Sequence, residues 1–483
     1  MNQQLRDKYE VIIGIECHVQ LATKSKLFCG CDNDSREAEP NTNVCSICFG
    51  MPGALPVLNG RAVELAVRMG LALGAQYPDS LHTKFDRKNY FYPDSPKGYQ
   101  ITQFDEPVVP GGEVVFPVNG ELKRVGITRA HLEGDAGKLT HPENSSASLV
   151  DLNRAETPLL EIVSEPDMRS AAEAKGYAKE LYNLARYAGV SDANLYYGNM
   201  RFDVNVSVHL PGEPFGTRTE TKNLNSFQAI EKAVEYEVRR QIVAVENGER
   251  IRQETRGWND VKLETYPMRS KEDADEYRYF PEPDLPPVII TSDMVKIQQN
   301  ELGLLPADLR LELTAAGLPL ESSEALVADP AAAFFWHEVV TKDANKAKFA
   351  FNWLIGDRVK LADTSGTDLA ASALTPEALV HVAKMVAEGQ LSSSNAKALL
   401  ADLWVNPADP LARATELNLL QESDTDELAK VVDEVIAANP QAVADYQGGN
   451  QRAFGALVGQ AMKATQGKGN PPVITKLLKG RLD

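Results

Sequence analysis

The sequence predicts an α+β protein in which a sheet-rich first part is followed by an all-helical remainder. Over roughly the first 290 residues, apolar and polar side chains alternate in short runs separated by turn residues, as they do in strands. The proline-rich run 281–287 can continue neither a helix nor a central strand, so a domain boundary is expected just beyond it. After this run the chain is rich in Ala and Leu at helical spacing.

Length and charge limit the class of protein. A chain of 483 residues is too long for one hydrophobic core, so two or three domains are expected. No stretch approaches the roughly 18 apolar residues of a membrane span, and the polar start 1–10 lacks the apolar core of a signal peptide. We therefore expect a cytoplasmic protein without membrane contact. The net charge of −18 argues against a nucleic-acid partner unless the basic residues are segregated.

The first expected element is a strand over 9–21. Its odd positions are all apolar, so in a strand they share one buried face, and Cys17 among them is expected in the core. Glu16, His18 and Gln20 then share the opposite face. A carboxylate and an imidazole two residues apart can ligate one cation, although a solvated surface is the commoner outcome for any single strand.

The other four cysteines form two close pairs. Cys29 and Cys31 are separated by thirteen residues from Cys45 and Cys48. Tetrahedral Zn²⁺ takes four soft ligands, and the short spacing lets each pair hold the ion from a tight turn. We predict a structural zinc site in the insert 29–48, the alternative being free thiols left from a lost site.

Two segments have the composition of binding loops. The segment 85–94 interleaves cations with aromatic residues, and 97–100 follows closely; this suits base stacking with phosphate contact, or a surface hairpin with a small aromatic cluster. The segment 219–226 is dense in hydrogen-bonding groups, although its last residue is also placed to cap the following helix. Its candidate cofactor-binding residues are Lys222, Asn223, Asn225 and Ser226.

Two further segments repeat the polar face of the first strand. In 202–208 the valines face inward and leave Asp203 on the opposite side, and in 130–135 the residues His131, Glu133 and Asp135 alternate away from the apolar positions. If these segments lie in one sheet, their acids converge, and convergent carboxylates repel unless a cation joins them. A Mg²⁺ site and a plain hydrated face are the two interpretations of this pattern.

Helices are expected among and after these strands. Ser170 and Glu173 form a capping box that begins a helix ending at Gly189, and a second helix covers about 226–246. In the helical remainder, Thr375 as N-cap precedes a proline at the first helical position.

The end of the chain is locally cationic. A break at 406–410 separates it from the rest of the helical part. No acidic residue occurs in 447–482, which suits a nucleic-acid surface as well as a merely solvated one. The basic residues of this segment are Arg452, Lys463, Lys468, Lys476, Lys479 and Arg481.

Three motifs of known enzymes are missing. The segment 135–139 ends like a P-loop, but Leu132 and Leu139 occupy the first glycine and the Ser/Thr positions. No G-x-S-x-G elbow and no Gly-Ser-rich amidase signature is present, so this chain is not expected to hydrolyse glutamine.

Eight strings carry a family resemblance that covers most of the first 290 residues. They are 11–20, 52–57, 85–93, 97–101, 151–154, 161–167, 222–227 and 277–285. Together they resemble the B subunit of aspartyl/glutamyl-tRNA(Asn/Gln) amidotransferase, the GatB family, and the helical remainder is similar in layout.

The resemblance implies three domains. They are a cradle-like catalytic domain around an antiparallel β-sheet at 1–291, which includes the zinc insert, an all-α helical domain at 292–409, and a small all-α YqeY-like tail at 410–483 that binds tRNA.

It also implies the reaction. ATP converts the side-chain carboxylate of Glu-tRNA(Gln) or Asp-tRNA(Asn) into an acyl phosphate, which ammonia attacks, while Mg²⁺ neutralises phosphate charge. An amidase-type A subunit supplies the ammonia through a tunnel, a small C subunit braces the pair into a heterotrimer, and the non-discriminating synthetase is a possible further partner. The implied catalytic residues are Glu16, His18, Glu133 and Asp203, which match the metal and nucleotide positions, with Lys88 and Tyr90 of the substrate loop, which also count as cofactor-binding.

The sequence departs from the family pattern at three places. Gly134 replaces a second Glu after Glu133, Glu156 replaces a usual Gly, and 196–198 lacks a usual acidic pair. Fewer carboxylates would weaken Mg²⁺ binding, and Asp135 is a candidate to compensate.

Two other functions are considered. One is a zinc-containing tRNA-binding scaffold without its own catalysis, which differs from the enzyme only in the acidic face. The other is an unrelated Mg²⁺-dependent phosphotransferase, which would give no reason for the cationic tail.

Overall fold

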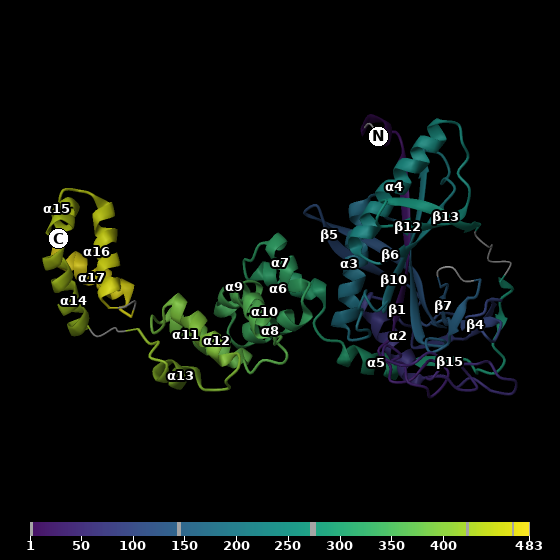
Figure 1. Ribbon diagram of the computed structural model, residues 1–483, viewed down its shortest axis with the longest axis horizontal. Helices are drawn as coiled ribbons and strands as arrows, with labels where there is room; N and C mark the ends of the chain where they lie inside the picture. Colours follow the sequence, from purple (N-terminus) through teal and green to yellow (C-terminus); the bar gives the residue numbers. More distant parts are fainter. Residues whose placement is uncertain (1–2, 143–145, 271–276, 422–424, 466–467, 483) are drawn as a thin grey trace. The chain divides into compact units, whose positions relative to one another are not determined.

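The computed structural model describes residues 3–142, 146–270, 277–421, 425–465 and 468–482. The chain forms two compact units, Met1–Asp308 and Leu309–Asp483, which are purple to teal and green to yellow in Figure 1. In the described ranges, no helix is both long and apolar enough to cross a membrane.

An eight-stranded sheet forms the centre of the first unit (Figure 1). Its strand order is β13-β12-β11-β10-β1-β9-β6-β5, and each neighbouring pair is antiparallel except β11 and β12. This one parallel pair arises because helix α4 carries the chain back between the two strands, as parallel neighbours require. The strands are β1 (Glu10–Gln20), β5 (Gly112–Val118), β6 (Glu121–Gly134), β9 (Pro158–Ser164), β10 (Met200–His209), β11 (Thr219–Leu224), β12 (Glu254–Asn259) and β13 (Glu264–Ser270).

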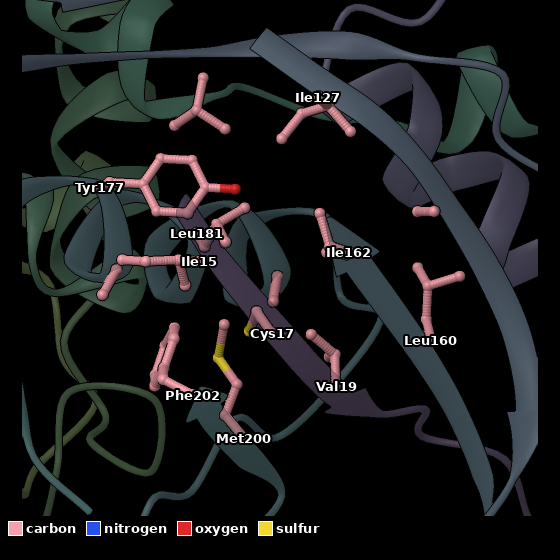
Figure 2. Close-up of a cluster of buried hydrophobic side chains, with 14 of the residues drawn as sticks. Ile15, Cys17, Val19, Ile127, Leu160, Ile162, Tyr177, Leu181, Met200 and Phe202 are labelled. Atoms are coloured by element: carbon pink, nitrogen blue, oxygen red, sulfur yellow. The ribbon is translucent and has the colours of Figure 1, made fainter. Parts of the chain in front are cut away.

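The alternation predicted for β1 is confirmed. Ile13, Ile15, Cys17 and Val19 are at most 1% exposed, whereas Glu16 and the other even positions near it are only partly buried. Figure 2 shows the apolar residues of β1 packed with those of its two neighbours and of a covering helix. Burial of this face therefore leaves the polar side chains of the same strand on the other side of the sheet.

Two long helices, α3 (Ala171–Tyr187) and α4 (Phe227–Glu246), cover the apolar face (Figure 1). The hydroxyl of Ser170 accepts a hydrogen bond from the backbone N–H of Glu173, as the capping box predicts, and Gly189 follows the helix end with φ of +62°. Helix α2 (Gly60–Ala72) contributes further apolar residues to the same core.

Short strands lie outside the large sheet. One three-stranded sheet joins β3 (Asp86–Asn89) to β4 (Tyr99–Thr102) and β14 (Phe280–Pro281), and β4 packs against β6. A strand also follows the proline-rich run. The remaining pairs are β2 (Ser80–Thr83) with β15 (Val288–Thr291) and β7 (Lys138–Thr140) with β8 (Leu149–Asp151).

The rest of the chain is helical, as predicted. Thr375 caps α11 through a hydrogen bond from the backbone N–H of Ala378, and Pro376 occupies the first helical position. The helices are α1 (Gln3–Arg6) and α5 (Ser292–Glu301), then α6 (Pro306–Ala315), α7 (Leu320–Val327), α8 (Pro330–Lys342), α9 (Ala347–Ile355), α10 (Asp357–Ser365), α11 (Pro376–Ala387), α12 (Ser393–Leu403), α13 (Pro410–Glu416), α14 (Thr425–Ala438), α15 (Pro440–Gln447), α16 (Gln451–Ala464) and α17 (Pro471–Leu482).

The cationic end of the chain has its own core. Leu428, Val432, Leu457, Ile474 and Leu478 pack between α14, α16 and α17 and are at most 1% exposed. Because the apolar side chains of these helices point inward, their basic side chains are displayed outward. The exposed ones are Arg452, Lys463, Lys476, Lys479 and Arg481, while Lys468 is half-buried.

Candidate active site

The register of the sheet brings the predicted polar residues together. Glu16 on β1 lies opposite Asp203 on β10, and His18 lies opposite Glu161 on β9. Strand β9 also pairs with β6, where Glu161 lies opposite His131. The three segments that the sequence analysis singled out thus belong to one sheet, and their acidic side chains gather on its polar face.

Two groups of potential metal ligands result. Within each group, the ligand atoms lie within 4.8 Å of one another, close enough for a single cation to contact all three. Carboxylate oxygens are the ligands that Mg²⁺ prefers, so the group of three carboxylates fits this ion, while the other group offers two carboxylates and an imidazole. One group is His18, Glu133 and Glu161, and the other is Glu16, Asp203 and Glu220.

Histidine balances the charge of the first group when no metal is bound. The Nε2 atom of His18 lies 3.5 Å from carboxylate oxygens of both Glu133 and Glu161, and that of His131 lies 3.3 Å from Glu161. Burial disfavours the charged imidazole, but the hydrogen bond to Glu161 and the nearby carboxylates outweigh it and raise the pKa of His18 to about 9. The same histidines lower the pKa of Glu161 against the opposing effect of burial.

Three cations face these acids. The ammonium of Lys222 contacts Asp203 and lies 3.4 Å from Glu220. Arg201 donates to Asp135 over 2.9 Å, and the charge of that carboxylate raises the pKa of the guanidinium. Burial disfavours the ammonium of Lys88, but nearby carboxylates more than offset this and raise its pKa. All three therefore remain charged around neutral pH.

The acids and cations line one cavity of about 480 Å³, a volume suited to a small-molecule ligand. It contains eight of the ten residues predicted for catalysis or cofactor binding outside the cysteine cluster: Glu16, His18, Lys88, Tyr90, Glu133, Asp203, Lys222 and Asn225. The side chain of Asn223 is outside the described part of the structure. Ser226 is not among the lining residues.

The aromatic segment forms a hairpin at the edge of this cavity. Tyr90 and Tyr92 stack with ring centroids 4.6 Å apart, and the ammonium of Lys88 lies 4.7 Å from the ring centre of Tyr277. The hairpin with an aromatic cluster is therefore confirmed, while base stacking and phosphate contact by this segment, which forms part of the cavity wall, stay a prediction.

Three charged cavity residues were not predicted as site residues from the sequence. Glu161 and Glu220 complete the two acidic groups, and Arg201 adds a cation to the wall. Lys97, from the predicted binding-loop segment, and Glu156, named above as a departure from the family pattern, also line the cavity. The signal that could have revealed Glu161 is its place as the one charged residue in an otherwise largely apolar strand.

Asp135 is held away from both acidic groups. It accepts from Arg201 over 2.9 Å and lies 3.2 Å from Nε of Arg154. Its two arginine partners neutralise its charge. The expected compensation for the missing carboxylate at position 134 therefore has no support in the geometry of Asp135.

The four clustered cysteines have the arrangement of a metal site. Their Sγ atoms lie within 4.8 Å of one another, and the distances from Cys48 to Cys29, Cys31 and Cys45 are 3.5, 3.8 and 3.9 Å. A tetrahedron of thiolates around Zn²⁺ has sulfur atoms about 3.8 Å apart, so the four residues fit that ion.

A buried lysine adjoins this cluster. Lys26 is 0% exposed, and its ammonium donates to the carbonyl of Asn43 over 2.9 Å and to Cys48 Sγ over 3.4 Å. The hydrogen bond from Cys29 lowers the pKa of Cys48 to about 4, and the charge of Lys26 adds to the effect. The thiolate form is thus favoured at Cys48, whereas the hydrogen bond to Cys48 raises the pKa of Cys29 and burial raises that of Cys31. Cys17 is separate and fully buried in the core, as predicted.

Ser226 has a structural role that can be separated from cofactor binding. Its hydroxyl accepts from the backbone N–H of Ala229 over 3.0 Å and caps α4. We predict that Ser226→Ala lowers the free energy of unfolding by about 1 kcal/mol in denaturant titrations. Ser226→Asp should retain the stability because Asp is an equally good cap. A loss of stability in the Asp variant as large as that in the Ala variant would contradict the capping role.

Comparison with known proteins agrees with this geometry. A family model for the GatB/GatE catalytic domain matches residues 11–296, and one for the GatB domain matches residues 335–482. The chain is 45% identical over 477 residues to the B subunit of the aspartyl/glutamyl-tRNA(Asn/Gln) amidotransferase of Thermoanaerobacter sp. strain X514, covering 98% of this chain and 99% of the relative.

Other relatives match over similar lengths. The B subunit of the same name from Alkalilimnicola ehrlichii is 46% identical over 480 residues, covering 99% of this chain and 100% of the relative. The chloroplastic/mitochondrial B subunit of the glutamyl-tRNA(Gln) amidotransferase of Physcomitrium patens is 45% identical over 491 residues, covering 100% of this chain and 87% of the relative. These matches confirm the family resemblance, and the chain therefore belongs to the family of aspartyl/glutamyl-tRNA(Asn/Gln) amidotransferase B subunits.

Proposed function

We propose that this chain carries the amide-forming site of a tRNA-dependent amidotransferase. Its relatives are named as amidotransferase B subunits. In the proposed reaction, ATP activates a side-chain carboxylate on misacylated tRNA before ammonia attacks it. The observation that carries the proposal is one cavity in which two acidic groups face three cations. Such a mixture suits a phosphoryl transfer, in which metal-binding acids and phosphate-binding cations must lie side by side.

The acidic groups are proposed to hold Mg²⁺. Glu16, Asp203 and Glu220 offer three carboxylates, and His18 with Glu133 and Glu161 offers two more and an imidazole. When bound, Mg²⁺ would neutralise phosphate oxygens during the transfer. The charge of the carboxylates is suited to divalent ions, whose binding strengthens with ligand charge.

The cations are proposed to bind ATP and the substrate. Lys88, Arg201 and Lys222 line the cavity, and each would contact phosphate oxygens or the substrate carboxylate. Tyr90 of the substrate loop, stacked on Tyr92, would form part of the wall that keeps water from the substrate. These residues would orient the substrate carboxylate toward the phosphate that it attacks.

The four cysteines are proposed to bind a structural Zn²⁺. All four tetrahedral positions would be filled by Cys29, Cys31, Cys45 and Cys48, which leaves no position for a catalytic water. The ion would stabilise the insert rather than take part in the reaction.

Partners are proposed to complete the enzyme. An amidase-type A subunit would produce ammonia from glutamine, a small C subunit would brace the pair, and the non-discriminating synthetase would supply the misacylated tRNA. Within this chain, we propose a catalytic domain at 1–291, a helical domain at 292–409 and a tRNA-binding tail at 410–483, acting in the cytoplasm.

The function is tested with the assembled complex. Misacylated Glu-tRNA(Gln) or Asp-tRNA(Asn) is incubated with ATP and either glutamine or ammonium chloride, and the amide on the tRNA is measured. We expect ATP-dependent Gln-tRNA(Gln) or Asn-tRNA(Asn) with either donor. Absence of product with both donors and both tRNAs would contradict the proposal.

The cationic tail makes a separate prediction. Replacing Lys463, Lys476 and Lys479 together by Gln is expected to raise KM for tRNA by about tenfold at moderate salt, because each exposed lysine would release counterions from phosphate. The slope of log KM against log salt should fall by roughly two to three. The value of kcat at saturating tRNA should change little.

A matched triple variant on other helices provides the control. Lys348, Lys360 and Lys384 are exposed lysines outside the proposed tail, and their replacement by Gln should leave KM for tRNA unchanged. Equal effects of the two triple variants would show that net charge, not the tail, governs binding. An unchanged KM for tRNA with an unchanged salt dependence after removal of the tail charges would show that the tail does not bind tRNA and would favour a small-molecule phosphotransferase.

A further inference from the structure

Glu156 is a cavity residue with an unusual backbone. It precedes β9 and lines the cavity. Its φ of +66° lies in the left-handed region, which residues other than glycine and asparagine seldom adopt. Holding a residue at such an angle costs free energy, and backbone strain of this kind is found mostly at functional positions. The conformation directs the carboxylate of Glu156 across the cavity wall toward Gly134.

The carboxylate uses space that exists only because residue 134 is glycine. A Cβ atom on Gly134 would lie 2.5 Å from Oε2 of Glu156 and 3.2 Å from its Cδ, far inside van der Waals contact. The Cα of Glu156 would be at an ordinary 3.5 Å. A side chain on residue 134 and the carboxylate of Glu156 therefore compete for this space, and the carboxylate would have to move if residue 134 carried a side chain.

Among the described residues, only one of the two carboxylate oxygens of Glu156 has a hydrogen-bond donor. Oε1 of Glu156 accepts from the ammonium of Lys97 over 2.7 Å. Oε2 is buried and, within the described ranges, no donor reaches it, while the residue as a whole is 8% exposed. Burial raises the pKa of Glu156 against the opposing charge of Lys97. A buried acceptor of this kind is costly unless a donor meets it.

We propose that the free oxygen of Glu156 binds the ammonia that forms the amide by accepting a hydrogen bond from one of its N–H groups. The inference rests on the proposed function and assigns to this residue the binding of the nitrogen nucleophile. An anionic acceptor attracts N–H donors and repels the phosphates and carboxylate of the other substrates. Lys97 holds the carboxylate in place through the other oxygen, so that Oε2 stays directed at the incoming nitrogen.

The test uses ammonium chloride as the amide donor in the assembled complex, so that glutamine hydrolysis by a partner plays no part. Glu156→Gln keeps the shape and an acceptor for Lys97 but removes the charge. We expect KM for ammonium to rise about tenfold in Glu156→Gln and further in Glu156→Gly, as for loss of a charge-assisted hydrogen bond. KM for ATP should stay within about twofold.

A compensating variant makes the test specific. In the double variant Glu156→Gly with Gly134→Glu, the space around position 134 is open, and the new carboxylate can enter it. We expect this variant to recover a substantial part of the affinity for ammonium that Glu156→Gly loses. Glu121→Gln, on an exposed position of β6, serves as the control and should have no effect.

Each outcome decides the inference. If Glu156→Gln and Glu156→Gly are folded and their KM for ammonium equals that of the unsubstituted protein, Glu156 is structural and the inference is wrong. If Glu156→Gly does not fold, the shape-preserving Gln variant decides alone. Failure of the unsubstituted complex to form any amide from ammonium would instead count against the proposed function itself.

Discussion

Glu16→Gln and Asp203→Asn are each expected to reduce kcat for ATP-dependent amide formation by about a thousandfold or more. The two side chains lie opposite each other on β1 and β10 and belong to one group of potential Mg²⁺ ligands. The amide variants keep the shape but remove a negative charge from a set of only three carboxylates, and also leave the ammonium of Lys222 with fewer partners. Amide formation on misacylated tRNA is the measurement.

Binding of tRNA separates this result from loss of structure. The affinity of the variant complexes for tRNA should be unchanged, because the substituted residues lie in the cavity and not on the cationic tail. Raised Mg²⁺ should restore part of the activity if the variants bind the ion more weakly. Glu10→Gln is a matched control, since Glu10 lies on the same strand but is exposed and outside the cavity lining.

The scaffold alternative makes the opposite prediction. If catalysis takes place elsewhere in the complex, Glu16→Gln and Asp203→Asn should leave amide formation intact. A double variant of Glu16 and His18 to Ala would then also be active. Full activity in all of these variants would show that the acidic face is a hydrated surface without a role in catalysis.

The polar face was predictable because side-chain direction in a strand has a period of two. The apolar odd positions of β1 determine where Glu16 and His18 point without any knowledge of neighbouring strands. That these residues meet Asp203 and Glu133 depends on the order and register of strands distant in sequence. A single sequence shows the polar faces but not which of them become neighbours.

Glu161 and Glu220 illustrate what could not be predicted. Glu161 is flanked by apolar residues in β9, and only the pairing of β9 with both β1 and β6 places it between His18 and His131. Glu220 enters the second group because β11 lies beside β10. The role of Ser226 was ambiguous for another reason, since one hydroxyl suits both a helix cap and a ligand contact.

Removal of zinc is expected to unfold the insert that the four cysteines hold together. Most residues of 32–47 are exposed or half-buried, so the segment has little apolar core of its own to replace the metal. Without the ion, the four clustered cysteine sulfurs would no longer be joined through a shared metal. We expect Cys48→Ser to release zinc and to lower the free energy of unfolding of this region by roughly 4 kcal/mol or more.

Limited proteolysis and zinc content are the measurements. Chelation or Cys48→Ser should make 29–57 rapidly cleavable and reduce zinc from one ion per chain to none. Cys17→Ala is the matched control: it alters a buried core cysteine but should leave zinc content unchanged. An unsubstituted chain that purifies without zinc, yet resists cleavage in this segment, would contradict the prediction.

The effect should extend to the cavity, because the insert supports its wall. The carbonyl of Asn43 and the sulfur of Cys48 both accept from buried Lys26, and the backbone of Gly50 lies against Lys97. Lys97 in turn holds the carboxylate of Glu156. Loss of zinc should therefore weaken use of ammonium as well as local stability, although no cysteine lines the cavity. Activity that survives complete unfolding of the insert would show that the wall keeps its shape without this support.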